Sequence, residues 1–469
     1  MSDNIKPYAS SFQIKSVVIY RVKSNESYDI TDLVQRFDYF ESVTSPVVSG
    51  TLVMVDSGAN LISSLPIQGT ERIQVSLIGP DNQQYDYDMN VYKIYSRFGA
   101  ERFQTYTLGL ISNEGLLNEG IRVTKTLSGK PNTIVQTLLK DYLKTDKELE
   151  EESTKFNIIF NPGKKSPFSI INSIQSKAVA NSSTSKVTEN KESKTTTSSN
   201  QSVSALKPVD SSDYGSVDGS AGYFFFENKD GYVFKSIDTL CAGEKSVGTY
   251  FQEPADVNSS PDRKILSIDF LNEIDILNKL RTGAFSSVIC YYNYSTGAYE
   301  EYVYSLDKSY ESMKHLGSQK GLPYGQKELS KYPTRVMSMV LDHETWYDGE
   351  DSASPEKRDG ENGATQFPDY QKFYMAQSIS RLNSLTNQKV KIKLNGSPAI
   401  KVGDVIDIMI PNQVTQEQKI TEKYDPEHSG TYLISEVNHV FDPKKRRCYT
   451  FLTLIRDSYG MKDYASKTQ

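Results

Sequence analysis

The sequence contains little of what marks a secreted, membrane-spanning or disulfide-bonded protein. It has 3 cysteines, 1 tryptophan and 4 histidines in 469 residues. Cys241, Cys290 and Cys448 are odd in number, far apart and in no CxxC arrangement. This argues against a disulfide framework or a zinc ribbon and favours synthesis in a reducing cytoplasm. No apolar run approaches the roughly 20 residues that cross a bilayer, and the N-terminus lacks the features of a signal peptide. We expect no membrane span.

Catalytic and metal-binding signatures are also missing. There is no Gly-x-Ser-x-Gly elbow and no GxxxxGK[ST] phosphate loop. The segment Asp342–Glu344 lies near other carboxylates but has neither HExxH spacing nor an EF-hand pattern, so it predicts an acidic loop. His439 falls in the middle of a predicted strand, where a hydrogen-bonded structural role is expected. We therefore predict that the chain is not an enzyme, and we assign no catalytic, cofactor-binding or metal-binding residue and no cofactor.

Charge argues against nucleic-acid recognition. The formal net charge is −6, and a surface that grips phosphates would show basic clusters. The one basic run, Lys444–Arg447, follows Asp442-Pro443 and predicts a hairpin tip, with binding of a phosphate or an acidic partner as the alternative. The carboxylate run Glu148–Glu152 predicts a helix end or a loop in water. The 31 tyrosines suit either subunit interfaces or, more simply, strands.

Two separate blocks of the chain read as antiparallel strands. Residues 389–460 alternate apolar and polar side chains with period two between Gly, Pro and Asp, as strands buried on one face require. Residues 11–121 hold six or seven further short strands, with a short helical or turn element at residues 60–65. Without long helices, these strands predict a small barrel, which removes exposed sheet edges.

The region between the two blocks is mixed. Apolar residues at helical spacing predict a helix over residues 132–143 and a second one beginning at Ser166-Pro167. Residues 223–236 predict two strands around an Asn-Lys-Asp-Gly turn. Residues 181–220 are rich in Ser, Thr, Asn and Lys and predict a flexible surface loop. The alternative is that this loop orders against a neighbour in an assembly.

The third region is split. Residues 264–270 and 285–292 predict strands, residues 295–368 an irregular excursion, and residues 370–385 a helix that returns the chain to the final strands. We therefore predict a mainly β fold with α+β parts: two similar small antiparallel β-barrels, the second one discontinuous, and a mixed α/β domain. The first barrel would span residues 1–121, the mixed domain 122–262 and 295–385, the second barrel 263–294 and 386–460, and a C-terminal tail 461–469.

The order of these elements resembles the baseplate hub subunit of T-even-type contractile-tailed bacteriophages, a family shared with type VI secretion and related injection particles. The resemblance covers nearly the full chain. It rests on turn-and-strand patterns at Phe40–Val43, Gly50–Ser57, Asn60-Leu61, Pro66–Glu71, Lys401–Ile406, Ser429–Ile434 and Asn438–Phe441. None of these is a catalytic fingerprint, so the specificity lies in their joint order.

The resemblance implies a structural virion protein, made in the bacterial host cytoplasm. It implies a homotrimer that forms a pseudo-sixfold ring, joins the hexameric tail tube above to a trimeric spike below, contacts other inner-baseplate proteins and leaves a bore for DNA. No spike or lysozyme segment follows Asp457, so the spike is expected to be a separate chain. Two alternatives remain: a glycan-binding tail protein or adhesin, and a cell-wall hydrolase that uses unpaired carboxylates.

Overall fold

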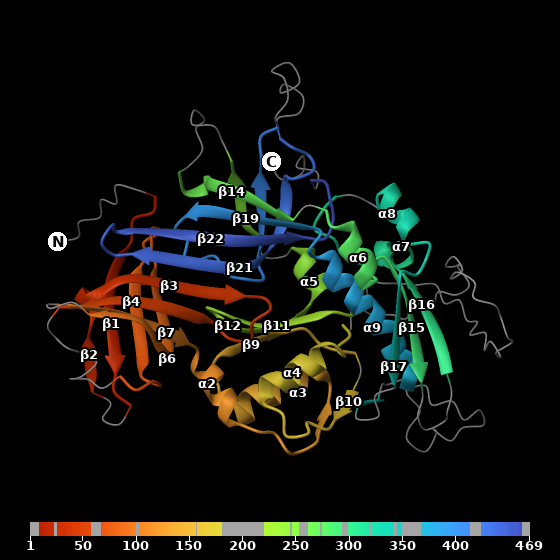
Figure 1. The fold of residues 1–469 in the computed structure, drawn as a ribbon, viewed down its shortest axis with the longest axis horizontal. Helices are drawn as coiled ribbons and strands as arrows, with labels where there is room; N and C mark the ends of the chain where they lie inside the picture. The colour runs from red at the N-terminus through yellow and green to blue at the C-terminus, as the bar shows by residue number, and fades with distance from the viewer. Residues whose placement is uncertain are drawn as a thin grey trace.

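The fold was analysed in a computed structural model. It describes residues 9–22, 26–57, 67–99, 103–155, 157–180, 220–243, 246–252, 261–272, 274–292, 299–318, 321–340, 345–348, 367–412 and 424–461. Strands make up 47% of the structure and helices 21%, which confirms the predicted mainly β class with α+β parts. One large sheet crosses the upper half of the molecule, and most helices lie below it or at one end (Figure 1).

The N-terminal strands form a first lobe at one end of this sheet (red and orange in Figure 1). Buried and half-buried residues alternate along β4, as the period-two pattern predicts. A 3-10 turn, η1 (Thr31–Leu33), leads into β3. The strands of the first lobe are β1 (Gln13–Tyr20), β2 (Ser27–Asp29), β3 (Val34–Ser42), β4 (Ser49–Asp56), β5 (Arg72–Ile78), β6 (Gln84–Gly99) and β7 (Gln104–Ile111).

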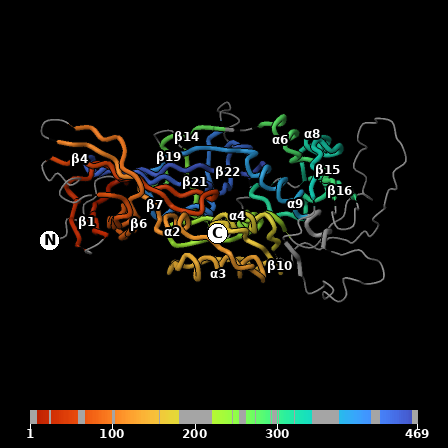
Figure 2. Tube along the Cα trace, turned by 60° about the horizontal axis from the view of Figure 1, so that its bottom comes forward, coloured from red at the N-terminus to blue at the C-terminus, as the bar shows by residue number. Residues whose placement is uncertain are grey.

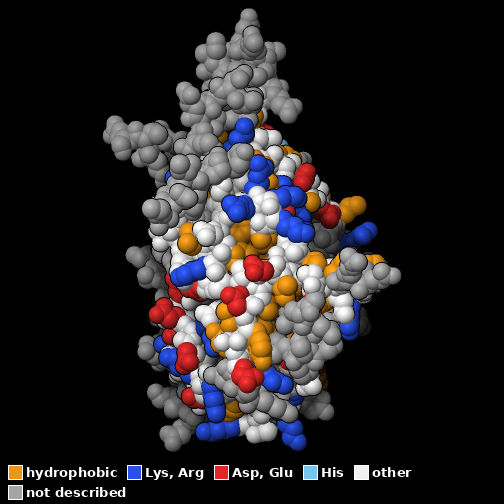
Figure 3. Space-filling view, turned by 90° about the vertical axis from the view of Figure 1, so that its left-hand side faces the viewer, with side chains coloured by type: hydrophobic (Ala, Val, Ile, Leu, Met, Phe, Trp, Pro, Cys, Tyr) orange, Lys and Arg blue, Asp and Glu red, His pale blue; other side chains and the backbone are white. Residues whose placement is uncertain are grey.

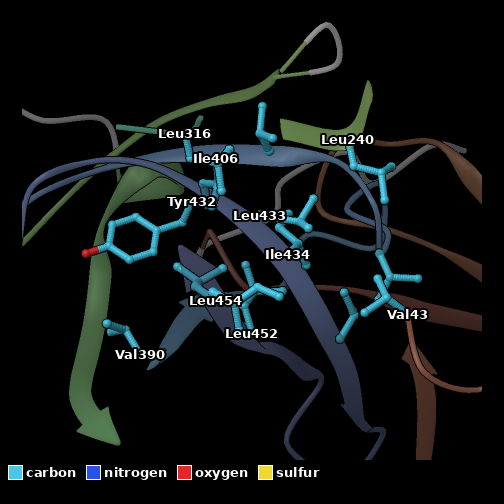
Figure 4. Close-up of a cluster of buried hydrophobic side chains, with 14 of the residues drawn as sticks. Val43, Leu240, Leu316, Val390, Ile406, Tyr432, Leu433, Ile434, Leu452 and Leu454 are labelled. Atoms are coloured by element: carbon cyan, nitrogen blue, oxygen red, sulfur yellow. The ribbon is translucent and has the colours of Figure 1, made fainter. Parts of the chain in front are cut away.

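A second lobe gathers strands from distant parts of the chain. Its core collects buried side chains from β19 to β22, with Leu240, Leu316 and Val43 joining from outside these strands (Figure 4). A 3-10 turn, η3 (Pro261–Arg263), precedes β14. The strands of the second lobe are β13 (Ser246–Phe251), β14 (Ile265–Asn272), β19 (Gln388–Asn395), β20 (Val405–Met409), β21 (Gly430–Asp442) and β22 (Arg447–Arg456).

The two lobes share one continuous sheet. Its strand order is β14-β19-β22-β21-β3-β4-β7-β6-β5-β1-β2, and β13 joins it through β20. The lobes meet where β21 pairs antiparallel with β3, from Glu436 opposite Ser42 to Phe441 opposite Phe37. In a second view the first lobe projects to one side of this junction, and the blue strands of the second lobe run away from it (Figure 2).

The mixed region packs below the sheet around its own core, which is built largely from α3, α4 and the β11–β12 hairpin. The predicted helix at residues 132–143 is confirmed, although its second half, η2, is a π-helix; the helix after Ser166 and the hairpin at residues 223–236 are also confirmed. The elements of this region are α2 (Asn113–Gly120), β8 (Leu127–Gly129), α3 (Pro131–Thr137), η2 (Leu138–Tyr142), β9 (Glu148–Glu151), β10 (Asn157–Phe160), α4 (Pro167–Gln175), β11 (Tyr223–Asn228), β12 (Gly231–Ser236) and α5 (Ile237–Ala242).

Two predictions for this region were wrong. The carboxylate run at residues 148–152 is neither a helix end nor a free loop, because β9 pairs in parallel with β12. Lys235 forms an ion pair with Glu150, and Glu152 accepts a hydrogen bond from the Ser236 amide, so these carboxylates are tied to the neighbouring strand. Residues 246–251, placed within the predicted mixed domain, form β13 and pair with β20 of the second lobe.

The predicted strand at residues 285–292 exists but does not belong to the second lobe. A short helix, α6 (Ile276–Thr282), follows β14, and Gly283 in the left-handed conformation (φ 72°) ends it. After this turn the chain enters a separate three-stranded sheet of order β16-β15-β17. The excursion at residues 295–368 is partly regular: the elements of this part of the chain are β15 (Ser286–Tyr292), β16 (Tyr299–Ser305), α7 (Leu306–Ser309), η4 (Tyr310–Ser312), α8 (Tyr324–Leu329), β17 (Arg335–Val340) and β18 (Thr345–Asp348).

Helix α9 (Phe367–Ser384) returns the chain to the sheet, as predicted for residues 370–385. Arg381, 1% exposed, pairs through Nη1 with Asp457 just after β22 and through Nε with Asp238 of α5 at 3.1 Å. Asp457 also accepts the Leu316 amide at 3.0 Å and lies 2.7 Å from His315 Nδ1. Arg381 holds the pKa of the buried Asp457 carboxyl far below its usual range despite the opposing effect of burial.

Some predictions fall on residues outside the described ranges. They are the element at residues 60–65, almost all of the Ser/Thr-rich segment 181–220, His343 and the tail after residue 461. The basic run at residues 444–447 is the turn between β21 and β22, as predicted. Across the part of the chain that the structure describes, no helix is long and apolar enough to cross a membrane.

We predict that Asp457→Asn lowers the free energy of unfolding by up to about 3–5 kcal/mol, because the buried Arg381 guanidinium loses one of its two carboxylate partners and keeps only Asp238. Urea unfolding followed by circular dichroism measures this loss. Asp88→Asn is the matched control: Asp88 also pairs with an arginine, Arg72, but both side chains are about half exposed. Its cost should stay below about 1 kcal/mol. An equal loss of unfolding free energy in the two variants would contradict a stabilising role of the buried Arg381–Asp457 pair.

Candidate functional site

The two lobes contain the same ladder of six strands. In the first lobe the neighbours run β3-β4-β7-β6-β5-β1, and in the second they run β14-β19-β22-β21-β20-β13. Read along the chain, each set appears in the same order, so β3 corresponds to β14, β6 to β21 and β7 to β22. One pair differs: β1 and β5 are antiparallel, whereas β13 and β20 are parallel. The predicted similarity of the two strand-rich blocks is therefore present in their topology.

The registers share two irregularities, although the β14–β19 ladder has a further one between Phe270 and Asn272 and the β6–β7 ladder a further one between Tyr95 and Phe98. The β3–β4 ladder has an irregularity between Val34 and Arg36, and the β14–β19 ladder has one at the corresponding place, between Ile265 and Ser267. The β6–β7 ladder is irregular between Val91 and Lys93, and the β21–β22 ladder between Ile434 and Glu436. Bulges interrupt a ladder at one defined residue, so their recurrence aligns the two lobes more sharply than strand order alone.

A shared turn supports this alignment. The Val91 carbonyl accepts the Thr70 amide, and the Val91 amide donates to Glu71; the Ile434 carbonyl accepts the Gly403 amide, and the Ile434 amide donates to Asp404. Thr70 and Gly403 both have left-handed backbones, with φ of 72° and 87°. Gly403 meets this requirement without strain, and a Cβ there would lie 2.6 Å from Phe226.

The lobes are joined by an aromatic core beneath the β3–β21 pairing. Phe441 of β21 stacks on Phe37 of β3 at a centroid distance of 5.8 Å, and both side chains are fully buried. Phe12 lies 5.3 Å from Phe441, and Tyr87 lies 5.5 Å from Phe37. Phe441 and Cys448 thus belong to the core of the first lobe although they lie at the end of the chain. Such packing makes the junction a rigid part of the fold rather than a hinge.

One buried carboxylate ties three parts of the chain together at this junction. Glu41 of β3, 3% exposed, accepts the Lys229 amide at 2.6 Å and the Val402 amide at 3.0 Å. Lys229 lies in the β11–β12 turn of the mixed region, and Val402 precedes β20 of the second lobe. Burial raises the pKa of Glu41 to about 7, and the amide donors act in the opposite direction.

His439 lies on the other strand of the junction. Its Nδ1 is 3.0 Å from Thr450 Oγ1 and its Nε2 is 3.1 Å from the Ile400 carbonyl. The neutral imidazole fits both contacts, because Nε2–H donates to the carbonyl while Nδ1 accepts from the hydroxyl. Burial lowers the pKa of His439 to about 4. The predicted hydrogen-bonded structural role of His439 is confirmed.

A third buried group links the mixed region to the first lobe. Lys147 Nζ lies 2.6 Å from Glu114 and 2.5 Å from Glu227, and Glu227 also accepts the Val48 amide at 2.9 Å. Since Val48 lies immediately before β4, this cluster holds the β3–β4 hairpin against the β11–β12 hairpin. All three parts of the molecule are therefore joined through satisfied buried charges.

The polar groups of this site hold the parts of the chain together. Among the residues that the structure describes, no three His, Cys, Asp or Glu side chains are grouped so that they could hold a metal ion. The three cysteines are buried and unlinked. No site residue was predicted from the sequence, and no motif indicated the buried contacts of Glu41, Lys147 and His315. The signal available for Glu41 was its place in the Phe40–Val43 strand end, where a charged residue interrupts apolar alternation.

The two buried titratable groups of the junction should have opposite effects on stability as the pH changes. The pKa of His439 falls from 6.5 to about 4 on folding, so its contribution is present above pH 6.5 and is lost as the pH falls toward 4. The pKa of Glu41 rises from 4.5 to about 7, so its contribution is present below pH 4.5 and is lost as the pH rises through 7.

We therefore expect two variants to diverge from the wild type with opposite slopes between about pH 4.5 and 6.5. As the pH increases through this range, the unfolding free energy of the wild type should rise relative to that of His439→Gln and fall relative to that of Glu41→Gln. Each difference should change by about 1.4 kcal/mol per pH unit. Urea titrations at several pH values measure both differences. Parallel pH curves for the wild type and either variant would show that the group does not titrate as described.

No protein-family model matches the sequence, and no curated protein matches it. Similar solved structures are a tail protein from Neisseria meningitidis MC58 (TM-score 0.48, 10% identity, 96% of this chain and 98% of that one), and the 43 kDa tail protein of prophage MuSo2 from Shewanella oneidensis (0.47, 7%, 96% and 100%). Another is an E. coli type VI secretion component (0.41, 9%, 96% and 79%).

Proposed function

We propose that three copies of this chain form the central hub ring of a contractile phage tail baseplate. The ring joins the hexameric tail tube above to a trimeric spike below. The observation that carries the proposal is the duplicated six-strand ladder, with matched bulges, in a single chain. Three chains with two similar lobes each present six similar units to a sixfold tube, while the ring as a whole keeps threefold symmetry.

The same duplication explains why one face can match a hexamer and another a trimer. The lobes share their ladder, but the mixed region and the β15–β17 sheet occur once per chain. A surface built from the ladders therefore repeats six times around the ring, and a surface built from the single-copy parts repeats three times. The spike, as a separate chain, would bind to the threefold surface, and other inner-baseplate proteins would bind around it.

The hub is proposed as a structural protein without catalytic activity. Its buried charges are engaged in holding the three parts of the chain together, as the contacts of Glu41, Lys147 and Arg381 illustrate. DNA would pass through the bore of the ring without sequence recognition, which suits a net charge of −6. The protein would be made in the host cytoplasm and reside in the baseplate of the virion.

We expect the purified chain to show a native mass near three times the 52.8 kDa of one chain, with the mass of the spike added when the spike is bound. Native mass spectrometry measures this mass, and electron microscopy of the complex shows whether the density repeats six times on one face and three times on the other. A chain that stays monomeric with both spike and tube proteins present would overturn the proposal. Binding to purified glycans by such a monomer would favour the adhesin alternative, and turnover of peptidoglycan would favour the hydrolase.

A further inference from the structure

The duplicated ladder leaves one strand edge in each lobe without the partner that its counterpart has. β3 pairs with β4 on one edge and with β21 on the other. Its counterpart β14 pairs with β19 on the corresponding edge, and residues 265–272 have no second partner among the described strands. Only Lys264, directly before β14, forms a single bridge with Phe251 at the end of β13. The open edge of β14 therefore corresponds to the edge of β3 that forms the junction between the lobes.

One half of β6 also has an edge without a paired strand among the described residues. Its counterpart β21 uses one edge twice: residues 430–433 pair with β20, and residues 436–441 pair with β3. In β6 the first half, residues 84–90, pairs with β5 on the corresponding edge. Residues 93–99 pair with β7 on the opposite edge only, within the part of the chain that the structure describes. This half of β6 corresponds to the half of β21 that holds β3.

We propose that the ring closes by strand addition between copies: residues 93–99 of β6 in one copy pair antiparallel with β14 of the next. This inference rests on the proposed ring and names its subunit contact. The β21–β3 ladder serves as the template, and the irregularities shared by β3 and β14 align Asp269 with Asp38. Phe98 follows a second irregularity of β6 and is aligned with Val440 through its β7 partner, Thr105, so it lies opposite Asp269 as Val440 lies opposite Asp38. Lys93 and Arg97 on β6 then face a strand that carries the acidic Asp269.

The side chains at the two open edges support this pairing. At the junction within the chain, Phe37, Tyr39 and Phe441 are 0%, 3% and 0% exposed. At the open edges, Phe98 of β6 is 64% exposed, and Phe270 and Leu271 of β14 are 39% and 54% exposed. Figure 3 faces the first-lobe end of the molecule and shows hydrophobic side chains exposed among charged side chains of both signs there.

An exposed apolar strand edge is a template for another strand, and folded proteins normally protect such edges. Here the apolar surface continues past β14 to Ile274 and Leu277, which are 67% and 66% exposed. A contact between two different edges is head-to-tail, so it produces a ring if each step repeats the same rotation. In the proposed ring the step between β14 and β6 repeats the one between β3 and β21, so a ring of three chains contains six such steps.

The first test disrupts each edge separately. Phe98→Asp places a carboxylate on the β6 edge, and Leu271→Asp places one on the β14 edge. Both side chains are exposed in the monomer, so the fold should survive, which circular dichroism checks. Each variant should raise the concentration at which trimers form by at least about tenfold. Val336→Asp is the matched control: Val336 is also an exposed apolar residue, 55%, on an edge strand, β17, and its substitution should leave the trimer unchanged.

The second test uses the direction of the contact. A Phe98→Asp chain keeps an intact β14 edge, and a Leu271→Asp chain keeps an intact β6 edge, so a mixture should form one-to-one heterodimers that native mass spectrometry resolves. A short bismaleimide should also link Phe98→Cys/Asp269→Cys chains into covalent trimers. The matched Phe98→Cys/Tyr28→Cys chain, with its second cysteine on the β2 edge, should not be linked.

The outcomes separate this contact from the ring itself. If the unsubstituted chain forms trimers and both aspartate variants do so equally well, strand addition at β6 and β14 is wrong while the ring stands. If the unsubstituted chain forms no trimer with its spike and tube partners, the proposed function fails as well. Homodimers of either variant alone would also overturn the head-to-tail contact.

Discussion

The structure depends on the antiparallel pairing of β3 with the second half of β21. This pairing fuses two ladders into one sheet and buries Phe441, from the end of the chain, in a core made by its beginning. The Glu41 carboxylate lies at the same place and binds amides of the mixed region and of the second lobe. Without β21 extending past β20, the lobes would be tethered by loops and their relative rotation would be undefined.

The second lobe is the more demanding half to assemble, because its strands come from two distant stretches of the chain, residues 246–272 and 388–456. Between β14 and β19 the chain leaves the sheet, builds the β15–β17 sheet and returns along α9. The buried Arg381 and Asp457 pair holds that return against the end of β22. A buried ion pair adds little net stability over an apolar contact, but it tolerates few alternative arrangements, which suits a position where distant segments must meet in one register.

The comparison of the two lobes turns an absence into information. Edge strands are common in β proteins. In a duplicated ladder, the paired counterpart of an edge strand shows which strand could pair with that edge. Among the described strands, β14 and residues 93–99 of β6 each pair on one edge only, whereas their counterparts pair on both edges. Phe270 and Phe98 are exposed, whereas their counterparts Tyr39 and Val440 are buried. The fold thus contains one complete contact of this kind, between β3 and β21, and the two edges that could form a second one, on β14 and on residues 93–99 of β6.

The sequence by itself determined the local structure of most of this protein. Period-two alternation predicted most strands of both lobes, although not β13, and the helix at 370–385 and the hairpin at 223–236 followed from spacing and turn residues. The sequence also indicated a strand at 285–292 but not its sheet, because alternation specifies one buried face and not a pairing partner. Likewise, the run at 148–152 looked like a solvated loop, since charge alone does not show that Lys235 and the Ser236 amide lie beside it.

Only the tertiary structure decided which edges meet. Glu41, Val402 and Lys229 are far apart in sequence, so no spacing rule could have joined them at one carboxylate. The matched bulges and the shared left-handed turn at Thr70 and Gly403 are also properties of the backbone. Different side chains can adopt the same backbone geometry, so the sequence does not reveal it. Strand pairing uses the peptide groups that every residue carries, and for that reason the partner of each edge is set by packing and not by the local sequence.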